Sequence, residues 1–269
     1  MNGWRSKFLI GSNHKMFKNT SQTLAYLKEL EMLISDGAPE DLHLFILTPF
    51  TALPAAIQQT QGRAIHIGAQ NMYCEDAGQF TGEISPLFLK EIGTRLVMAG
   101  HSERRHGFGE SDSLINRKVL AGLEHGFTVL VCVGETAQDR QYGITSERVR
   151  EQVKIALHGV KPGQMSNLWI AYEPVWAIGL GSTAAPPEYA DSVHHAIHDV
   201  ITELYPGRDL GVPVLYGGSI DGGNAAGLLE QPFIDGLFMT RYALEARNLS
   251  DLIHNTYPIW KQKSRASVP

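Results

Sequence analysis

Cysteine is scarce in this sequence. Only Cys74 and Cys132 occur among 269 residues, and neither lies in a CxxC pair or a cluster with histidines. Disulfide frameworks and zinc sites are therefore not expected. Near the start, only Phe8–Ile10 is continuously apolar, far less than the core of a signal peptide or a membrane span. We expect a cytoplasmic protein without a membrane segment.

Positive charge is not concentrated anywhere along the chain. Lysine and arginine together number 23 against 28 aspartates and glutamates, a formal charge of -5, and no dense basic cluster occurs. This balance argues against a surface for nucleic acid or anionic membranes and favours a small ligand. Hydrophobic residues make up 43% of the chain, which is enough for a large core.

Short apolar runs recur along the chain with glycine or proline at their ends. They are rich in β-branched, aromatic and aliphatic residues, as buried strands are. The runs span residues 8–13, 42–50, 64–71, 95–101, 128–135, 168–174, 213–219 and 236–242.

Segments with helical spacing separate these runs. The predicted helices cover residues 20–35, 111–126, 146–160, 186–207 and 248–260. This alternation predicts a parallel sheet covered by helices, either an open doubly wound sheet or a closed barrel. Eight units, and no GxGxxG after the first strand, favour a closed (β/α)8 barrel over residues 1–260 with a flexible C-terminal tail at 261–269.

Polar residues gather where the predicted strands end, which is where the active site of such a barrel lies. They are Asn13, Lys15, Gln70, Asn71, His101, Ser102, Glu135, Glu173 and Ser219. A carboxylate base with an imidazole and an ammonium group could remove a proton next to a carbonyl and hold the resulting enediolate. This chemistry needs no metal and no cofactor. A Ser–His triad from His101 and Ser102 is not expected, because neighbouring strand residues point to opposite faces.

Several segments resemble the signatures of the triosephosphate isomerase family, in the same order over nearly the whole chain. They are GSNHKM, GAQNMY, GQFTGEIS, AGHSERR, CVGE, YEPVWAIGLGSTA and YGGS. The resemblance implies an aldose-ketose isomerase of glycolysis and gluconeogenesis that acts on a sugar phosphate.

The resemblance also implies residue roles. Glu173 would be the base, and His101 a neutral electrophile whose pKa is held down by the start of a helix. Lys15 would add positive charge, Asn13 would orient the substrate, and Glu103 would be a buried partner of Lys15 or a second proton carrier. Ser102 would be a supporting hydrogen-bonding residue.

By the same resemblance, the segment after Pro174 would be a lid that closes over the phosphate, with the Gly179 N–H as one contact. Gly217, Gly218 and Ser219 would form the phosphate cradle with the end of the eighth strand. The Asn71–Ser85 loop would dock into a second subunit, bringing Thr81 near the neighbour's mouth, so a homodimer is implied.

The sequence departs from the family at the eighth strand. Thr240 and Arg241 stand where the family has a Gly-Gly pair, and Arg241 could either point inward to bind phosphate or lie on the rim. Smaller departures are His14 for a common tryptophan, and Leu180 and Ser182 in the lid. The phosphate site is the change that bears on substrate.

Three functions stay open at this point. The chain could be a triosephosphate isomerase with a modified cradle, or it could resemble the branch of the family that isomerises four-carbon ketose phosphates such as erythrulose phosphate in tetritol breakdown. A non-catalytic sugar-phosphate sensor is the third, although retention of Asn13, Lys15, His101 and Glu173 argues against it.

Overall fold

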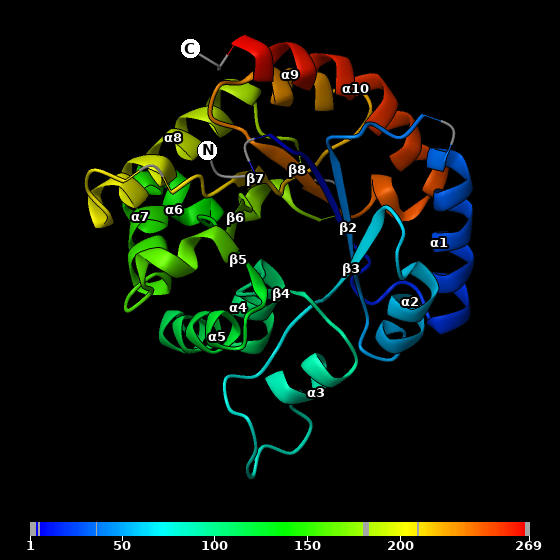
Figure 1. Ribbon diagram of the computed structural model, residues 1–269. Helices are drawn as coiled ribbons and strands as arrows, with labels where there is room; N and C mark the ends of the chain where they lie inside the picture. The colour runs from blue at the N-terminus through cyan, green and yellow to red at the C-terminus, as the bar shows by residue number, and fades with distance from the viewer. Residues whose placement is uncertain (1–3, 5, 36, 180–182, 209, 267–269) are drawn as a thin grey trace.

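Eight parallel strands close into a barrel at the centre of the computed structural model (Figure 1). The structure describes residues 4, 6–35, 37–179, 183–208 and 210–266. Each strand pairs with the next in sequence, and β8 closes on β1 through Leu9 and Gly236. The closed (β/α)8 barrel predicted from the alternation is confirmed. The strands are β1 (Phe8–Asn13), β2 (Leu42–Thr48), β3 (Ile65–Ala69), β4 (Leu96–Ala99), β5 (Thr128–Val133), β6 (Leu168–Tyr172), β7 (Val214–Tyr216) and β8 (Gly236–Met239).

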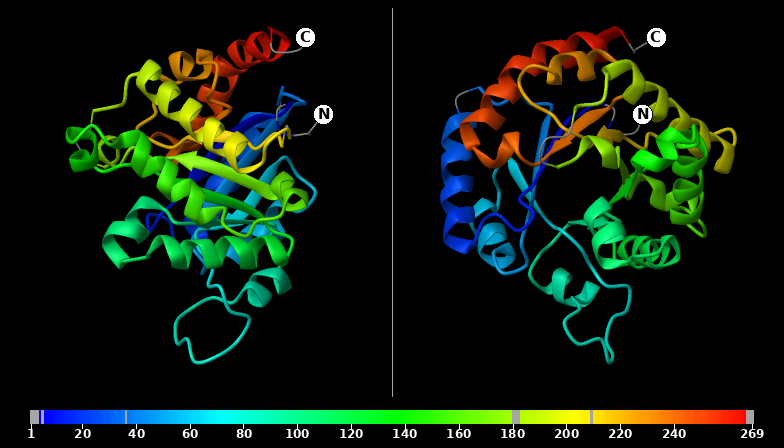
Figure 2. Two further views of the ribbon diagram at one scale, coloured as in Figure 1. Left: turned by 90° about the vertical axis from the view of Figure 1, so that its left-hand side faces the viewer. Right: turned by 180° about the vertical axis from the view of Figure 1, so that it is seen from behind.

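Helices surround the barrel in a ring (Figure 2). The α-helices are α1 (Thr20–Ser35), α2 (Leu53–Thr60), α3 (Pro86–Glu91), α4 (Ser102–Phe108), α5 (Asp112–Glu124), α6 (Ala137–Gln141), α7 (Thr145–Ala156), α8 (Pro187–Leu204), α9 (Ala225–Glu230) and α10 (Ala246–Ala266). Short 3-10 helices are η1 (Pro162–Asn167), η2 (Val175–Ala177) and η3 (Tyr242–Leu244). Periodicity found the long helices but not α2, α3, α4, α6 and α9, because a helix of two turns or less shows almost no period.

Side chains alternate between two cores along each strand. Leu9, Phe45 and Trp169 point into the barrel, whereas Phe8 and Ile10 point outward against the helices. This alternation is the period of two that a strand imposes. Apolar side chains fill the barrel interior, and the polar residues that follow the strands lie at its mouth.

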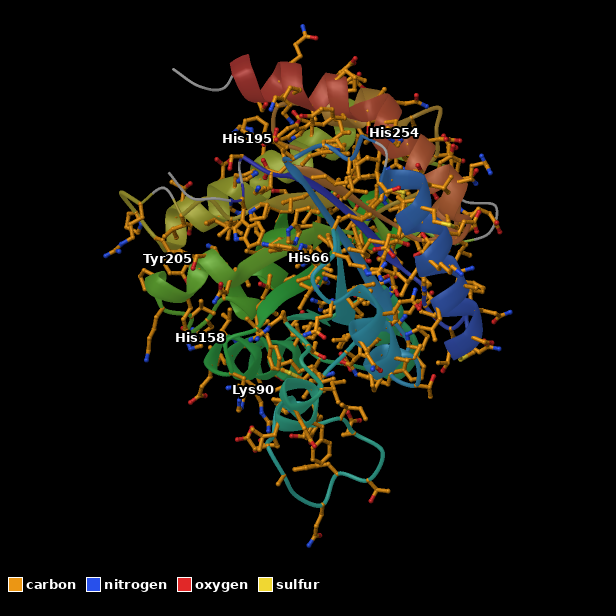
Figure 3. All side chains as sticks on the ribbon, turned by 45° about the vertical axis from the view of Figure 1, so that its right-hand side comes forward. His66, Lys90, His158, His195, Tyr205 and His254 are labelled. Atoms are coloured by element: carbon orange, nitrogen blue, oxygen red, sulfur yellow. The ribbon has the colours of Figure 1, made fainter. Side chains whose placement is uncertain are left out.

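The N-terminal end of the barrel is covered by aromatic rings. Trp4 packs edge-on against His43 and Trp169, with ring centroids 5.0 and 4.8 Å away, and its Nε1 donates to the Ser166 carbonyl. The His43 ring stacks on His66 at 4.2 Å, and Figure 3 labels His66 inside the ring of helices. This end lies opposite the strand ends that carry the polar residues.

Helix α10 replaces part of the loose tail expected from the sequence. It runs through Ala266, so residues 261–266 are helical. Lys263 Nζ also donates to the Ile234 carbonyl at 2.7 Å, which ties this end of the helix to the barrel. Residues 267–269 lie outside the described part. Among the described helices, none combines the length and apolar character needed to cross a membrane.

Candidate active site

Glu173 stands directly after β6 and is buried at the mouth of the barrel. Its backbone N–H donates to the Val133 carbonyl at 2.7 Å, which continues the pairing with β5 by one residue. Its Oε2 accepts the Ser102 N–H at 2.9 Å, and its Oε1 lies 3.2 Å from His101 Nε2. The side chain is only 3% exposed. The carboxylate is therefore held by two donors away from bulk water.

His101 caps the N-terminus of α4. Its Nδ1 accepts the Glu103 N–H at 3.2 Å, and a ring nitrogen that accepts carries no proton. The neutral ring thus has its proton on Nε2, which faces Glu173. The expectation that His101 and Ser102 are neighbouring strand residues is wrong. Strand β4 ends at Ala99 and Ser102 begins α4, so Ser102 contributes its backbone N–H.

Asn13 and Lys15 share one polar cluster at the end of β1. Asn13 Oδ1 accepts the Lys15 N–H at 2.8 Å and Gln70 Nε2 at 3.0 Å. Lys15 has a left-handed φ of 45°, and Gln70 Nε2 also donates to its carbonyl at 2.8 Å. Sequence reasoning named Gln70 but not this role. Because a left-handed conformation is unfavourable for lysine, these contacts must stabilise it.

The Lys15 side chain reaches Glu103 rather than solvent. Lys15 Nζ lies 2.8 Å from Glu103 Oε1 and is 15% exposed as a side chain. Glu103 is indeed the partner of Lys15, but it is 54% exposed, so the expectation of a buried carboxylate is wrong. Glu103 points outward because it lies in the first turn of α4, where only Ser102 is buried.

Two glycines leave room for Glu173. A Cβ on Gly134 would meet the Glu173 carbonyl oxygen at 1.9 Å, and a Cβ on Gly217 would meet Glu173 Cγ at 2.9 Å. The Gly217 N–H donates to the Tyr172 carbonyl at 2.7 Å. Gly217 thus continues the strand pairing of the barrel and makes space for the carboxylate. Its N–H was expected to help hold the phosphate, but in this structure it already donates to the Tyr172 carbonyl. No role was predicted for Gly134, although it lies in the CVGE segment at the end of a predicted strand.

The opposite side of the mouth carries Ser219 and Arg241. Arg241 Nη2 donates to Ser219 Oγ at 3.1 Å, so the guanidinium reaches across from the end of β8 to the loop after β7. The Arg241 backbone has φ -55° and ψ -52°, which any residue adopts. Arg241 therefore fits at this position without backbone strain, with its fork turned toward Ser219. Thr240 lies beside it and is half-buried.

The expected lid is described only at its ends. Gly179 has a left-handed φ of 107°, and the departures at Leu180 and Ser182 lie outside the described residues. Ahead of it, the Ala177 carbonyl accepts the Ser219 N–H at 3.1 Å. Gly218 is packed against Tyr216, whose Oη would be 2.3 Å from an added Cβ. The base of this segment is therefore tied to the Ser219 loop.

His14, between Asn13 and Lys15, is buried and packs edge-on against Tyr26. Burial, with Lys18 nearby, lowers the pKa of His14 to about 4, and neither of its ring nitrogens has a hydrogen-bond partner among the residues that the structure describes. In the described part of the chain, no group of three or more His, Cys, Asp or Glu side chains is arranged to hold a metal ion. The mouth itself combines a carboxylate, an imidazole, an ammonium and a guanidinium, a set suited to an anionic substrate that exchanges a proton.

Comparison with known proteins gives one consistent result. The family model "Triosephosphate isomerase" matches residues 8–256. The triosephosphate isomerase of Chloroflexus aurantiacus is 43% identical over 248 residues, covering 91% of this chain and 98% of that protein. That of Aquifex aeolicus is 40% identical, covering 92% and 98%. The L-erythrulose-1-phosphate isomerase of Rhizobium etli is 42% identical, covering 91% and 90%.

Proposed function

The chain belongs to the triosephosphate isomerase family, and on that premise we propose that it interconverts dihydroxyacetone phosphate and glyceraldehyde 3-phosphate through an enediolate. The observation that carries this proposal is the pairing of Glu173 Oε1 with His101 Nε2 at 3.2 Å in a buried mouth. Moving a proton between neighbouring carbons needs a base and a hydrogen-bond donor for the carbonyl oxygen. The chain is an isomerase, and these two side chains are proposed to carry the proton transfer.

Each side chain has one proposed role. Glu173 turns from Ser102 toward the substrate, takes a proton from the carbon beside the carbonyl, and returns it to the other carbon. His101 donates from Nε2 to the carbonyl oxygen, which gains negative charge, and the proton of the neighbouring hydroxyl passes to that oxygen through the same nitrogen, so that carbonyl and hydroxyl exchange places. Lys15, held by Glu103, stabilises that charge, and Asn13 orients the substrate; the contacts among these residues support the assignment.

The substrate phosphate is proposed to rest between Ser219, Thr240 and Arg241, with Gly179 of the lid above it. The support is the Arg241 guanidinium, which lies 3.1 Å from Ser219 Oγ and can form a fork with phosphate oxygens. The Ser219 N–H now donates to the Ala177 carbonyl at the base of the lid. Phosphate binding would therefore compete with a contact that holds the lid.

The test is kcat/KM of the purified protein on glyceraldehyde 3-phosphate, with Glu173→Ala as the blank. We expect turnover of the triose near the diffusional ceiling of about 10⁸ M⁻¹ s⁻¹. Activity that survives in Glu173→Ala would remove Glu173 from the role of base.

A four-carbon ketose phosphate is the second candidate substrate. The Rhizobium etli relative supports it, and so does Arg241 at the phosphate end of the mouth. In an erythrulose 1-phosphate the extra carbon lies at the end remote from the phosphate. A phosphate held by the long Arg241 side chain could sit farther from Glu173 and leave room for that carbon.

The two substrates are separated by measuring both side by side in wild type and in Arg241→Gly. If Arg241 sets the substrate, the four-carbon compound should be preferred by the wild type and lose at least tenfold in kcat/KM relative to the triose in Arg241→Gly. Preference for the triose in both proteins would make Arg241 a tolerated change.

A sugar-phosphate sensor on the same barrel needs no base. Glu173→Asp distinguishes the two ideas, because an enzyme should lose about a hundredfold in turnover when its base is displaced by roughly 1 Å, with phosphate binding retained. A wild-type protein that binds phosphate but turns over neither substrate would favour the sensor.

We also propose a homodimer formed through the Asn71–Ser85 loop. This segment protrudes from the ring of helices between β3 and α3 (Figure 1). The Tyr73 N–H donates to the Ile84 carbonyl at 2.8 Å, and the Tyr73 and Phe80 rings lie 4.6 Å apart, so the loop is internally braced. Phe88 and Phe108, exposed by 57% and 72%, offer apolar surface for an interface.

A further inference from the structure

A buried hydrogen bond joins the two ends of the chain beside the mouth. Helices α1 and α10 lie side by side (Figure 1). From α1, Tyr26 Oη donates to the Ala243 carbonyl at 2.7 Å, across 217 residues of sequence. Tyr26 is 4% exposed and Ala243 is 0% exposed, so bulk water cannot replace this donor. The contact therefore fixes the segment after β8 against helix α1.

The Ala243 carbonyl lies within the short turn that Arg241 begins. Arg241 directly precedes η3, and its own carbonyl accepts the Leu244 N–H at 3.2 Å. A 3-10 turn of three residues has few torsions to adjust, so a fixed carbonyl within it also fixes the Arg241 backbone. From that backbone the guanidinium reaches Ser219 Oγ at 3.1 Å.

The ring of Tyr26 packs against the segment after β1. The His14 ring lies edge-on to it, with ring centroids 4.6 Å apart, and Lys18 Nζ lies 5.0 Å from its centroid. His14 directly precedes Lys15, whose ammonium group is proposed to act at the reacting end of the substrate. Tyr26 thus contacts the segment that carries Lys15 with its ring and the turn that carries Arg241 with its hydroxyl.

The Tyr26 hydroxyl is a permanent donor. Burial is the main cause that holds the pKa of Tyr26 above its usual range, and the nearby Glu245 and Glu29 add to it. The hydroxyl therefore keeps its one proton, which goes to the Ala243 carbonyl. Phenylalanine at this position would remove the donor and keep the ring that packs on His14.

We propose that Tyr26 is a positioning residue for the phosphate end of the site, because it holds the turn from which Arg241 reaches the phosphate. This inference rests on the proposed function, in which Arg241 and Ser219 receive the substrate phosphate. Tyr26 acts through the Ala243 carbonyl and does not itself contact the phosphate. It fixes the Arg241 turn relative to the segment that carries Lys15.

Loss of the Tyr26 hydroxyl should weaken phosphate binding without removing a phosphate ligand. The Ala243 carbonyl would lose its donor in a buried place, and the turn would have to shift to recover one. The Arg241 fork would then be less well aligned with the phosphate oxygens. Because the effect passes through Arg241, it should disappear when Arg241 is absent.

The experiment is a double-mutant cycle on the full-length protein, with inorganic phosphate as the probe. Chemical-shift titrations give the phosphate Kd of wild type, Tyr26→Phe, Arg241→Ala and the double variant. Tyr26→Phe should raise the Kd about three- to tenfold when Arg241 is present, as expected for one hydrogen bond. In the Arg241→Ala background the same change should raise the Kd by less than about twofold.

Steady-state kinetics give a second readout that a general loss of stability would not mimic. On the sugar phosphates, Tyr26→Phe should raise KM about three- to tenfold and leave kcat within about twofold, because binding is weakened and the chemical groups stay in place.

Tyr205→Phe is the matched control. It removes a hydroxyl that donates to the Val160 carbonyl at 2.9 Å, from the residue that follows α8 (Figure 3). This variant also loses one hydrogen bond from a tyrosine to a backbone carbonyl, but it should leave the phosphate Kd and KM unchanged. Thermal unfolding of both variants shows whether each keeps its fold.

The outcomes separate this inference from the proposed function. Equal or tighter phosphate binding by Tyr26→Phe would overturn the inference, as would the same weakening in the Arg241→Ala background or in Tyr205→Phe. A wild type that does not bind phosphate would also overturn it. If the cycle shows coupling through Arg241 but wild type isomerises neither sugar phosphate, the proposed function alone fails, because the titration does not depend on turnover.

Discussion

At the scale of single residues, the position of Glu173 depends on what its neighbours lack. Gly217 has no side chain where a Cβ would lie 2.9 Å from Glu173 Cγ, and Ser102 contributes a backbone N–H that any residue except proline could supply. The carboxylate is thus placed by backbone geometry, which tolerates few changes of shape.

Gly217→Ala should lower kcat much more than it raises KM. The added methyl must push Glu173 aside, and a displacement of about 1 Å can cost roughly a hundredfold in rate. Gly163→Ala is the control, because a Cβ there meets nothing within 4 Å. Steady-state kinetics of both variants give the answer, and a Gly217→Ala enzyme with wild-type kcat would show that Glu173 has room to move.

At the scale of elements, the loop of residues 71–85 is the segment proposed to contact a second copy of the chain. Thr81 is exposed on this loop, and it is proposed to enter the neighbour's mouth. A site that needs the partner's loop would lose activity when the loop cannot dock.

Thr81→Lys should weaken dimerisation at least tenfold, because a long charged side chain cannot enter a closed interface without losing its hydration. Sedimentation equilibrium at several concentrations measures this. Thr202→Lys makes the same change on the exposed face of α8 and should leave the assembly intact. A monomeric wild type, or a fully dimeric Thr81→Lys protein, would contradict the proposed interface.

The periodicity of the sequence predicted long helices well and short helices poorly. Residues 20–35, for example, gave α1 to the residue, because four turns repeat their apolar face enough to be recognised. Periodicity did not find helix α4, since its seven residues carry almost no period, and only the resemblance implied a helix start after His101. Arg241 could be found as a departure, but its contact with Ser219 depends on how β7 and β8 meet. Nothing in the sequence signalled that Tyr189, within a predicted helix, reaches Glu135.

At the scale of the whole molecule, buried histidines link stability to pH. Burial is the main cause that lowers the pKa of His14 to about 4 and the pKa of His43 and His194 to about 3. Unfolded histidines titrate near 6.5, so between these values the unfolded chain binds more protons than the folded one. Stability is therefore fully present above about pH 6.5 and is lost as the pH falls.

We expect the free energy of unfolding to fall by up to about 1.4 kcal/mol per pH unit for each of these histidines, or about 4 kcal/mol per pH unit for the three together, between roughly pH 6 and pH 4.5. Urea unfolding at pH 7, 5.5 and 5 measures the slope. His43→Phe should lower the pH slope of the free energy of unfolding by the contribution of one proton. The phenyl ring can stack on His66 as the His43 ring does, but it cannot bind a proton. A free energy of unfolding that stays constant from pH 7 to pH 5 would contradict the burial of these histidines in their neutral form.

The rings around Trp4 close the end of the barrel opposite the proposed active site. Because the strands are all parallel, residues that hold this end together and residues proposed to select substrate lie at opposite ends of the same barrel, and changes at distant sites add. Natural selection could therefore strengthen one end to offset a destabilising change at the other, such as a new residue in the proposed phosphate cradle. A barrel with this division can change its substrate while its free energy of unfolding is maintained by the other end.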